Sequence, residues 1–523
     1  MNTIDIKKIP PFVSHVTKTL QDNGFEAYLV GGCVRDLLMN RTPKDWDITT
    51  NAIPEQIQAI FAALNLKTVY ENNFGTVTIL NMAPEKEDRV TSDVAKAMPD
   101  KRETPDQDNQ VQVTTYRSEG KYSDNRRPDS VTYETKLEKD LERRDFTMNA
   151  LAFDLVKGIM VDNFKGQSDI TDKIVRCVLY PEDRFEEDAL RMLRAIRFST
   201  TLNFAIADET MKGIVAKAPL LANISHERIR DEFAKIILSD SPAAGIEMLQ
   251  KTGLLHYMIT ELEEGIGVEQ KGAHIYDVYN HLLHALQHAA DKGFSLEIRL
   301  AALFHDIGKP ATRRYDANKD KYTFFGHEVV GAKITKKVLE RLKFSRETID
   351  LVVSLVRNHM FFSDTEQITL SAVRRIIQKV RPEHIWELME VRECDRVGMK
   401  KAEAPYRLRK YHAMIEEALR DPISVTQLAI DGTYLMNELH RSPDGIPAGI
   451  KPGPRMGWIL HALLEEVLDN PALNTVQELH DRALKLDDLA DKDLKTLGEK
   501  GKEQKESINE AEITGLRKKH GVK

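Results

Sequence analysis

The spacing of apolar residues changes at about Glu186, and this change constrains the fold more than any other feature of the chain. Before it, apolar residues gather in short strand-like runs. After it, they recur at helical spacing, as in A-L-R-M-L-R-A-I-R-F and L-V-V-S-L-V. We predict strands at Phe25 to Val30, from Asp45 onward, at Gly75 to Leu80 and at Val111 to Tyr116. The expected fold is α+β, with a small mixed sheet followed by a mainly α-helical remainder.

Composition limits the class of protein. With 523 residues the chain is too long for one ordinary core, so several domains are expected. A net charge of −7 argues against a uniformly basic coat, although a local basic surface can still bind RNA. Cys33, Cys177 and Cys394 form no C-x-x-C pair, so neither a disulfide framework nor a thiolate zinc site is predicted. We find no secretory signal or membrane-spanning run, and expect a cytoplasmic protein without a membrane partner.

Asp45 and Asp47 form a D-x-D pair at the start of the second predicted strand. Side chains two apart on a strand point to the same face, so both carboxylates can bind one metal centre, and their oxygens suit Mg²⁺. Gly31 and Gly32 lie between a predicted strand and a predicted helix, where the missing Cβ lets backbone N–H groups approach a triphosphate. Taken alone, a D-x-D triplet is most often solvated surface, and a Gly-Gly pair is as often an ordinary tight turn.

The segment from Tyr28 to Thr50 reads Y-L-V-G-G-C-V-R-D-L-L-M-N-R-T-P-K-D-W-D-I-T-T. It resembles the head motif of the class II tRNA nucleotidyltransferase and bacterial poly(A) polymerase family, within the polymerase-β-like superfamily. Further motifs follow in the family's order: R-R-D-F-T-M-N-A from Arg143, D-N-F-K-G-Q from Asp162, E-E-D-A-L-R-M-L-R from Glu186 and H-E-R-I-R-D-E-F from His226. The resemblance covers roughly residues 25 to 240 and, more loosely, the rest, and it implies a nucleotidyltransferase head.

Family chemistry implies that Asp45 and Asp47 are catalytic and hold two Mg²⁺ ions, which promote attack of an RNA 3′-hydroxyl on the α-phosphate and release of pyrophosphate. It also implies a set of nucleotide-binding residues. These are Gly31, Gly32, Arg35, Arg144, Asp145, Asn149, Asp188, Arg191, Arg194 and Arg197. One position departs from the family pattern: many relatives carry an acidic residue where this chain has Gln112, so we expect two carboxylates to suffice.

Asp188 and Arg191 are three apart in a helical pattern, so they are expected to share a face and to present an acceptor beside donors. Carboxylate to the exocyclic amino group and guanidinium to the ring nitrogen would satisfy both cytosine and adenine. Uracil and guanine present the reverse order. Without the family motif, a solvated i,i+3 salt bridge would be the better interpretation.

Two further segments before Arg143 differ in composition. Residues 81 to 110 are polar and are interpreted as a disordered insertion. The stretch S-E-G-K-Y-S-D-N-R-R-P-D contains Arg126 and Arg127, which we assign to RNA binding. In relatives, a loop here accompanies the switch from CTP to ATP, so its presence favours complete CCA addition. A plain hairpin excursion is the alternative.

A second cluster has the ordered pattern H…HD…H…H…D, which resembles the HD phosphohydrolase superfamily. Its members are His281, His305, Asp306, His327, His359 and Asp395. The apolar helix L-A-A-L-F precedes the His-Asp pair and I-G-K-P follows it, so the pair is expected at a helix end facing a cleft. Imidazole and carboxylate suit Mn²⁺, Ni²⁺, Fe²⁺ or Mg²⁺. His284 and His288 share a helical face with His281 but are left out of the predicted site.

These features predict a template-independent enzyme that adds CCA to tRNA from CTP and ATP. Its HD domain is expected to hydrolyse phosphomonoesters or 2′,3′-cyclic phosphates at damaged RNA 3′ ends. The alternatives are a bacterial poly(A) polymerase that uses only ATP and an HD phosphohydrolase with a secondary head. A monomer and a homodimer both stay open. The predicted domains are a head (1–155), a helical neck (156–260), an HD domain (261–410), a helical body (411–500) and a flexible tail (501–523).

Overall fold

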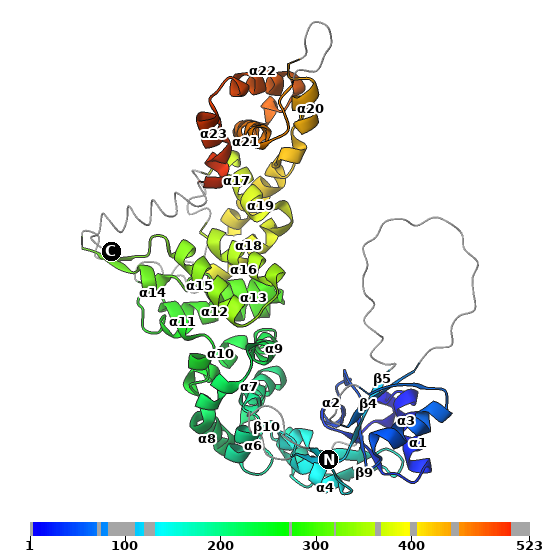
Figure 1. Ribbon diagram of the computed structural model, residues 1–523. Helices are drawn as coiled ribbons and strands as arrows, with labels where there is room; N and C mark the ends of the chain where they lie inside the picture. Colours follow the sequence, from blue (N-terminus) through cyan, green and yellow to red (C-terminus); the bar gives the residue numbers. More distant parts are fainter. Residues whose placement is uncertain are drawn as a thin grey trace. The chain divides into compact units, whose positions relative to one another are not determined.

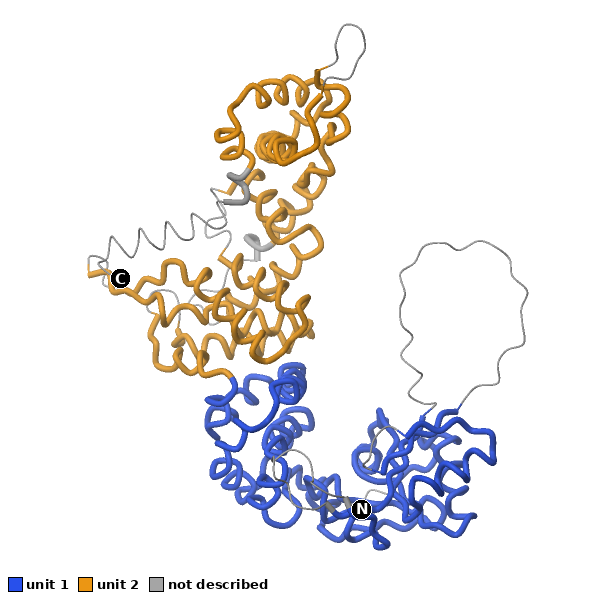
Figure 2. Tube along the Cα trace, viewed as in Figure 1, with its two compact units in different colours: residues 1–258 blue, residues 259–523 orange. Residues whose placement is uncertain are grey.

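The computed structural model describes residues 4–70, 75–81, 110–119, 131–270, 275–317, 321–360, 368–397, 405–440 and 449–503. Nearly all of the predicted insertion, the loop with Arg126 and Arg127, and most of the predicted tail lie outside the described residues. The chain divides into two compact units, Met1–Met258 and Ile259–Lys523, coloured separately in Figure 2. The finer division into head, neck, HD domain and body stays a prediction.

The first unit begins with a mixed sheet (Figure 1). Its strands follow the order β3-β4-β5-β2-β1-β8-β9, in which β2 and β5 are parallel and the other neighbours are antiparallel. The strands are β1 Ala27–Val30, β2 Asp47–Thr50, β3 Lys67–Tyr70, β4 Thr76–Leu80, β5 Gln110–Thr115, β8 Ala152–Asp154 and β9 Ile159–Val161. The small mixed sheet predicted from the sequence is confirmed.

Short helices pack on this sheet and connect its strands. They are α1 Pro11–Asp22, α2 Gly32–Leu38, α3 Pro54–Ala63, α4 Leu137–Glu142 and α5 Gly166–Thr171. Val30 of β1 and Ala152 of β8 lie side by side in the sheet and pack with Leu137 and Leu141, so α4 buries this apolar face. A small antiparallel pair, β6 Arg117–Glu119 and β7 Val131–Tyr133, precedes α4.

The second predicted strand begins two residues late. Asp47 opens β2, whereas Asp45 lies in a bend before it and is exposed. The reason is the register of β2 on β1, which pairs Leu29 with Ile48. Beyond Val30 the chain turns at Gly31 into α2, so β1 offers no partner for Asp45. The prediction that both carboxylates lie on the strand is therefore wrong for Asp45.

The rest of the first unit is helical, as predicted. Its helices are α6 Pro181–Glu187, α7 Leu190–Leu202, α8 Asp208–Lys217, α9 His226–Ile237 and α10 Pro242–Lys251. Leu193, Ile196 and Phe233 are buried where α7 packs against α9. One two-residue parallel pair, β10 Ile174–Val175 with β11 Ala205–Ile206, interrupts the helices.

The second unit is also mainly helical (Figure 1). Its first part contains α11 Thr260–Glu263, α12 Val278–Asp291, α13 Leu296–Phe304, α14 Lys309–Thr312, β12 Arg314–Asp316, β13 Lys321–Thr323, α15 His327–Arg341, α16 Arg346–Asn358, α17 Leu370–Val380 and α18 Ile385–Asp395. Its second part contains α19 Pro405–Ala418, α20 Gly432–Asn437, α21 Pro454–Asp469, α22 Val476–Asp487 and α23 Asp491–Glu503. Side-chain caps fix several starts, among them Asp277 on α12, Ser295 on α13 and Ser345 on α16. Among the described residues, none of these helices combines the length and the apolar character needed to cross a bilayer.

Candidate active site and metal centre

Gly31 links β1 to α2 at the centre of the head. Its φ of +79° lies in the region that favours glycine, and a Cβ there would come within 2.9 Å of Arg144 Nη1. The backbone conformation therefore favours glycine, and a Cβ there would displace the Arg144 guanidinium. The Gly31 N–H donates to the Leu151 carbonyl at 3.2 Å, so this N–H is already used within the protein.

The Asp47 side chain is half-buried at the first position of β2, and the charges of Asp45 and Arg144 act on its carboxyl group. Burial raises the pKa of the Asp47 carboxyl, Arg144 opposes this rise, and Asp45 adds to it. Two carboxylates in this setting fit a divalent cation. Its charge would offset the cost of burying the Asp47 carboxylate and the repulsion between the two carboxylates. Gln112 is the partner of Asp47 on the parallel strand β5 and is exposed. A neutral amide thus stands directly beside Asp47 in the sheet.

A buried polar network joins the sheet to α7. Asp145 accepts hydrogen bonds from Asn149 Nδ2 at 3.0 Å and from Arg194 Nε at 2.8 Å. Asn149 in turn accepts one from Arg35 Nη1 at 2.8 Å. Burial alone would raise the pKa of Asp145, but the charge of Arg194 and the hydrogen bond from Asn149 lower it. Asp145 is therefore ionised and orients Arg194 and Asn149, and Asn149 in turn holds Arg35.

Three of the predicted arginines surround one ring. The guanidinium carbons of Arg35, Arg194 and Arg197 lie 5.2, 5.6 and 4.2 Å from the centroid of Phe198. These distances fit cation–π contacts. Arg197 Nε also contacts a carboxyl oxygen of buried Glu232 on α9 at 3.0 Å. The structure thus gathers these arginines on one side of α7.

Asp188 does not share a helix with Arg191. It lies in extended conformation between α6 and α7 (φ −139°, ψ 101°), while Arg191 is in the first turn of α7. The expected i,i+3 pair on one helical face is therefore wrong, because Asp188 lies before α7, where its side chain accepts from the Leu190 N–H at 3.1 Å. Its other oxygen accepts from Arg228 Nη2 of α9 at 2.8 Å.

Arg191 is buried and held by partners of its own. Its Nη1 donates to Glu187 Oε2 at 2.6 Å and to the Arg184 carbonyl at 3.2 Å, and its Nη2 donates to the Arg143 carbonyl at 3.0 Å. These contacts fix the orientation of the guanidinium before any nucleotide binds.

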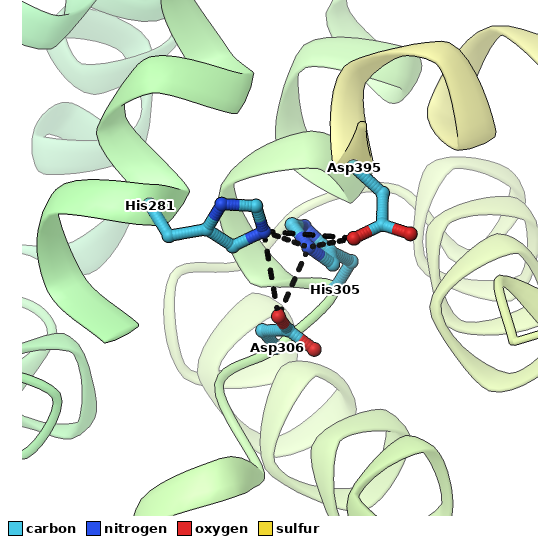
Figure 3. Close-up of side chains that lie close together, drawn as sticks. All are labelled: His281, His305, Asp306 and Asp395. Carbon is cyan, nitrogen blue, oxygen red and sulfur yellow. Dashed lines mark hydrogen bonds and ion pairs between the residues drawn. The ribbon is translucent and has the colours of Figure 1, made fainter. Parts of the chain in front are cut away.

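The six residues of the H…HD…H…H…D pattern come together in the second unit, and Figure 3 shows four of them, His281, His305, Asp306 and Asp395. One group is His281, His305, Asp306 and Asp395, whose ligand-type atoms lie within 4.8 Å of one another. The Nε2 atoms of His281 and His305 are 3.2 Å apart, and that of His305 is 3.4 Å from Asp395 Oδ1. The other group is Asp306, His327 and His359. Asp306 is common to both groups.

The hydrogen bonds of the rings favour metal binding. The Nδ1 atoms of His305, His327 and His359 lie 2.8, 2.7 and 2.7 Å from the carbonyls of Ala302, Phe324 and Val356. An Nδ1–H that donates to a carbonyl leaves the Nε2 lone pair facing the cluster, as a metal ligand requires. The donor set of four imidazoles and two carboxylates therefore fits a divalent transition metal.

The predicted helix end is confirmed, but the expected cleft is not. The helix α13 stops at Phe304, directly before His305, and both His305 and Asp306 are buried. A Cβ on Gly308 would meet the His327 carbonyl at 2.3 Å and the Gly331 nitrogen at 2.5 Å. The turn after the His-Asp pair thus packs backbone to backbone on α15, and this close approach requires glycine at position 308.

Lys309 adds a positive charge to the cluster. Its Nζ lies 2.5 Å from Asp306 Oδ2 and donates to buried Gln270 Oε1 at 2.6 Å. Burial alone would raise the pKa of Asp306, but Lys309 and His305 hold it well below its usual value. In the absence of a metal, a fixed ammonium thus balances part of the carboxylate charge.

Three families match the chain in sequence order. They are "Poly A polymerase head domain" at residues 27–176, "Probable RNA and SrmB- binding site of polymerase A" at residues 203–266 and "HD domain" at residues 274–397. The CCA-adding enzyme of Geobacillus thermodenitrificans is 40% identical over 268 residues, which cover 51% of this chain and 59% of that enzyme. These matches make the chain similar to poly(A) polymerase head domains and to CCA-adding enzymes. It spans about three fifths of the length of this relative.

Solved structures of CCA-adding enzymes share the fold. The Bacillus stearothermophilus enzyme in complex with CTP is 26% identical, with a TM-score of 0.64 over 92% of this chain and 98% of that one. The Thermotoga maritima enzyme complexed with tRNA_CCA is 19% identical, with a TM-score of 0.54 over 92% of this chain and 97% of that one, and shows likeness of fold alone.

Sequence reasoning missed three positions of these sites. Arg228 lies in the motif that begins at His226, but nothing in its spacing indicated a bond to Asp188. Lys309 follows the His-Asp pair by three residues, a spacing that could have indicated the contact with Asp306. Gln270 gave no signal, because its partner is distant in the sequence. His288, which we left out of the metal site, contacts Glu393 at 3.1 Å instead.

Proposed function

We propose that this protein adds CCA to the 3′ end of tRNA from CTP and ATP without a nucleic-acid template. The observation that carries the proposal is the match to the head domain over residues 27–176, which contain Asp45, Asp47 and Arg144, together with 40% identity to a CCA-adding enzyme. The similar Bacillus stearothermophilus structure holds CTP, which supports this nucleotide as a substrate. The RNA-binding family that matches residues 203–266 supports an RNA acceptor.

In this proposal, Asp45 and Asp47 hold Mg²⁺. The bound cations would lower the pKa of the RNA 3′-hydroxyl and offset the charge of the triphosphate. Arg144 lies against Gly31 and near Asp47, so its guanidinium can meet a phosphate there. In the reaction, the 3′-oxygen forms a bond to the α-phosphorus, the bond to pyrophosphate breaks, and the hydroxyl proton passes to solvent.

Asp188 and Arg191 are proposed to select the base. The fixed orientation of Arg191 supports this role, because a guanidinium that is already held by Glu187 loses little entropy on binding. Asp188 keeps acceptor capacity beside its bond to Arg228, since each carboxylate oxygen has two lone pairs. The contacts to a base would then come from two side chains on different elements.

A second activity is supported by the HD cluster. We propose that His281, His305, Asp306, His327, His359 and Asp395 hold one or two divalent cations, Mn²⁺, Ni²⁺, Fe²⁺ or Mg²⁺, because Asp306 belongs to both groups of ligands. Such a centre supplies an activated water for hydrolysis of phosphomonoesters or 2′,3′-cyclic phosphates. The protein's own part is to hold four imidazoles and two carboxylates in a buried shell and to place Lys309 beside Asp306.

Nucleotide addition is tested with three tRNA transcripts that end before CCA, after C and after CC. Each is incubated with the protein, Mg²⁺ and one labelled nucleoside triphosphate at a time. Incorporation of C, C and A in order, followed by a stop, is expected. Repeated A addition to any RNA would instead identify a poly(A) polymerase, and no incorporation by the parent protein would overturn both assignments.

A further inference from the structure

A two-stranded hairpin joins two elements of the HD cluster. β12 and β13 are antiparallel, with Tyr315 opposite Tyr322. The chain enters β12 from α14, which begins three residues after Asp306, and leaves β13 four residues before His327. Both ends of the hairpin are thus anchored to residues of the proposed metal site.

The hairpin carries exposed aromatic rings. Phe325, just after β13, is 73% exposed, and Tyr315 is 56% exposed. The rings of Tyr315 and Tyr322 meet edge to face, with centroids 5.5 Å apart. Exposed large apolar side chains cost solubility, so two such rings on one short hairpin point to a surface that a ligand covers.

Positive charge accompanies these rings. The Arg313 guanidinium lies 3.7 Å from the centroid of the Tyr322 ring, and its buried Nε has no hydrogen-bond partner in the described part of the chain. Arg314 is exposed beside it. The described hairpin residues include one acidic side chain, Asp316. Aromatic faces beside guanidinium groups are the combination that binds unpaired bases and phosphates in single-stranded nucleic acid.

The aromatic surface lies next to the metal ligands. Phe325 is two residues from His327, so their Cα atoms are at most about 7 Å apart. The neighbouring Phe324 carbonyl contacts His327 Nδ1 at 2.7 Å, and the Phe324 ring lies 5.6 Å from Lys309 Nζ. A base stacked on this hairpin would therefore bring its own phosphate toward the cluster.

We propose that the β12–β13 hairpin, with Arg313, Arg314, Tyr315, Tyr322 and Phe325, binds the single-stranded 3′ end of RNA and guides its terminal phosphate to the HD centre. This inference rests on the proposed HD phosphohydrolase activity and adds the substrate class: an oligonucleotide rather than a free nucleotide. A peptide partner fits less well, because two arginines precede Tyr315 and the Arg313 guanidinium lies over the Tyr322 ring, which makes this surface cationic as well as aromatic.

The test uses the full-length protein and a single-stranded RNA that carries 4-thiouridine near a 2′,3′-cyclic phosphate end. Photo-cross-linking followed by mass spectrometry locates the bound residues, which are expected to include Tyr315, Tyr322 or Phe325. Phe325→Ala and Tyr315→Ala are compared with Trp386→Ala, which removes a partly exposed ring elsewhere in the unit. Losing one stacked base should weaken oligonucleotide binding about 5- to 150-fold.

Hydrolysis distinguishes docking from structural damage. The hairpin variants should raise KM for the oligonucleotide and leave kcat/KM for bis(p-nitrophenyl) phosphate unchanged. Equal loss with both substrates, unchanged oligonucleotide binding, or cross-links confined to other elements would overturn the docking proposal. If the parent hydrolyses neither substrate but the variants lose binding and cross-links, the phosphohydrolase proposal fails while RNA docking stands. Cross-linking of an added peptide library in place of RNA would indicate a protein partner and contradict the proposal.

Discussion

The two candidate sites hold their charged groups in opposite ways. In the HD cluster, buried carboxylates and imidazoles from separate helices converge on a common point, and Lys309 offsets part of the charge. In the head, Asp45 is exposed and Asp47 half-buried, while the nearby arginines are engaged by Asp145, Glu187 and Glu232. The first site is complete without a substrate. The second holds two carboxylates and several guanidinium groups that are already oriented, and these side chains can meet an incoming anion.

This contrast indicates what each site needs in order to work. A buried shell of ligands binds its metal whether or not substrate is present. A pair of carboxylates of which one is exposed binds Mg²⁺ weakly and depends on the triphosphate to complete the coordination. We therefore expect the HD metal to remain through purification and the head metal to exchange freely.

The largest effect is expected at the head. Asp47→Ala should lower nucleotide incorporation by at least about 10²- to 10³-fold, because it removes a proposed Mg²⁺ ligand that would serve the transition state. Binding of tRNA should stay close to that of the parent. Incorporation is measured with a radiolabelled nucleotide, and Asp22→Asn, an exposed carboxylate at the end of α1, serves as the control. Near-normal turnover of Asp47→Ala would contradict the assignment.

The next prediction separates the two sites. His305→Ala combined with Asp306→Ala should remove metal-dependent hydrolysis of bis(p-nitrophenyl) phosphate and abolish tightly bound metal, but spare CCA addition. Metal content is measured by mass spectrometry after extensive dialysis. His288→Ala is the matched control, since His288 lies on α12 with His281 but contacts Glu393. A double variant that folds and still hydrolyses at the parental rate would place the hydrolytic site elsewhere.

A smaller and more selective effect is expected at Asp188. Asp188→Ala removes the proposed acceptor for the exocyclic amino group, so UTP should compete with CTP. Loss of one charge-assisted bond corresponds to roughly ten- to a hundredfold in discrimination. Steady-state kcat/KM for all four nucleotides on a tRNA that lacks CCA gives the measurement. A uniform loss of rate with the parental order of preference would make Asp188 structural.

Arg228 provides the control for that result. If its bond orients the Asp188 carboxylate, Arg228→Gln should reduce discrimination in the parent but have no further effect in Asp188→Ala. Arg230→Gln, on the same helix but paired with exposed Asp231, should leave discrimination unchanged. Additive effects of the Arg228 and Asp188 changes would show that Arg228 acts independently.

The sequence indicated the elements and ligand types of these sites better than their contacts. The strand-to-helix turn at Gly31 and the six HD residues could be predicted, because each motif determines residue types in a fixed order. Asp188 was misplaced, because apolar periodicity continues across the break between α6 and α7 and does not show a cap. The bonds of Arg228 to Asp188 and of Gln270 to Lys309 join separate elements, and one-dimensional spacing contains no information about such packing.

The smallest effect is expected at the buried Asp145 network. It shows whether the charge of Asp145 stabilises the fold of the head. The pKa of the Asp145 carboxyl is lowered in the folded protein, whereas the pKa of an Asp in an unfolded chain is about 3.9. Ionised Asp145 therefore stabilises the fold fully above the unfolded pKa, and this contribution is lost as the pH falls through the lower folded pKa. Asp145→Asn should lower the local opening free energy of α7 at pH 7. The difference in this free energy between the parent and the variant should shrink by on the order of 1 kcal/mol as the pH falls from 5 to 3. Hydrogen exchange of the α7 amides, corrected for intrinsic rates, gives the local opening free energy at each pH. A gap that stays constant over this range would mean that Asp145 acts through shape and hydrogen bonding rather than through its charge on Arg194.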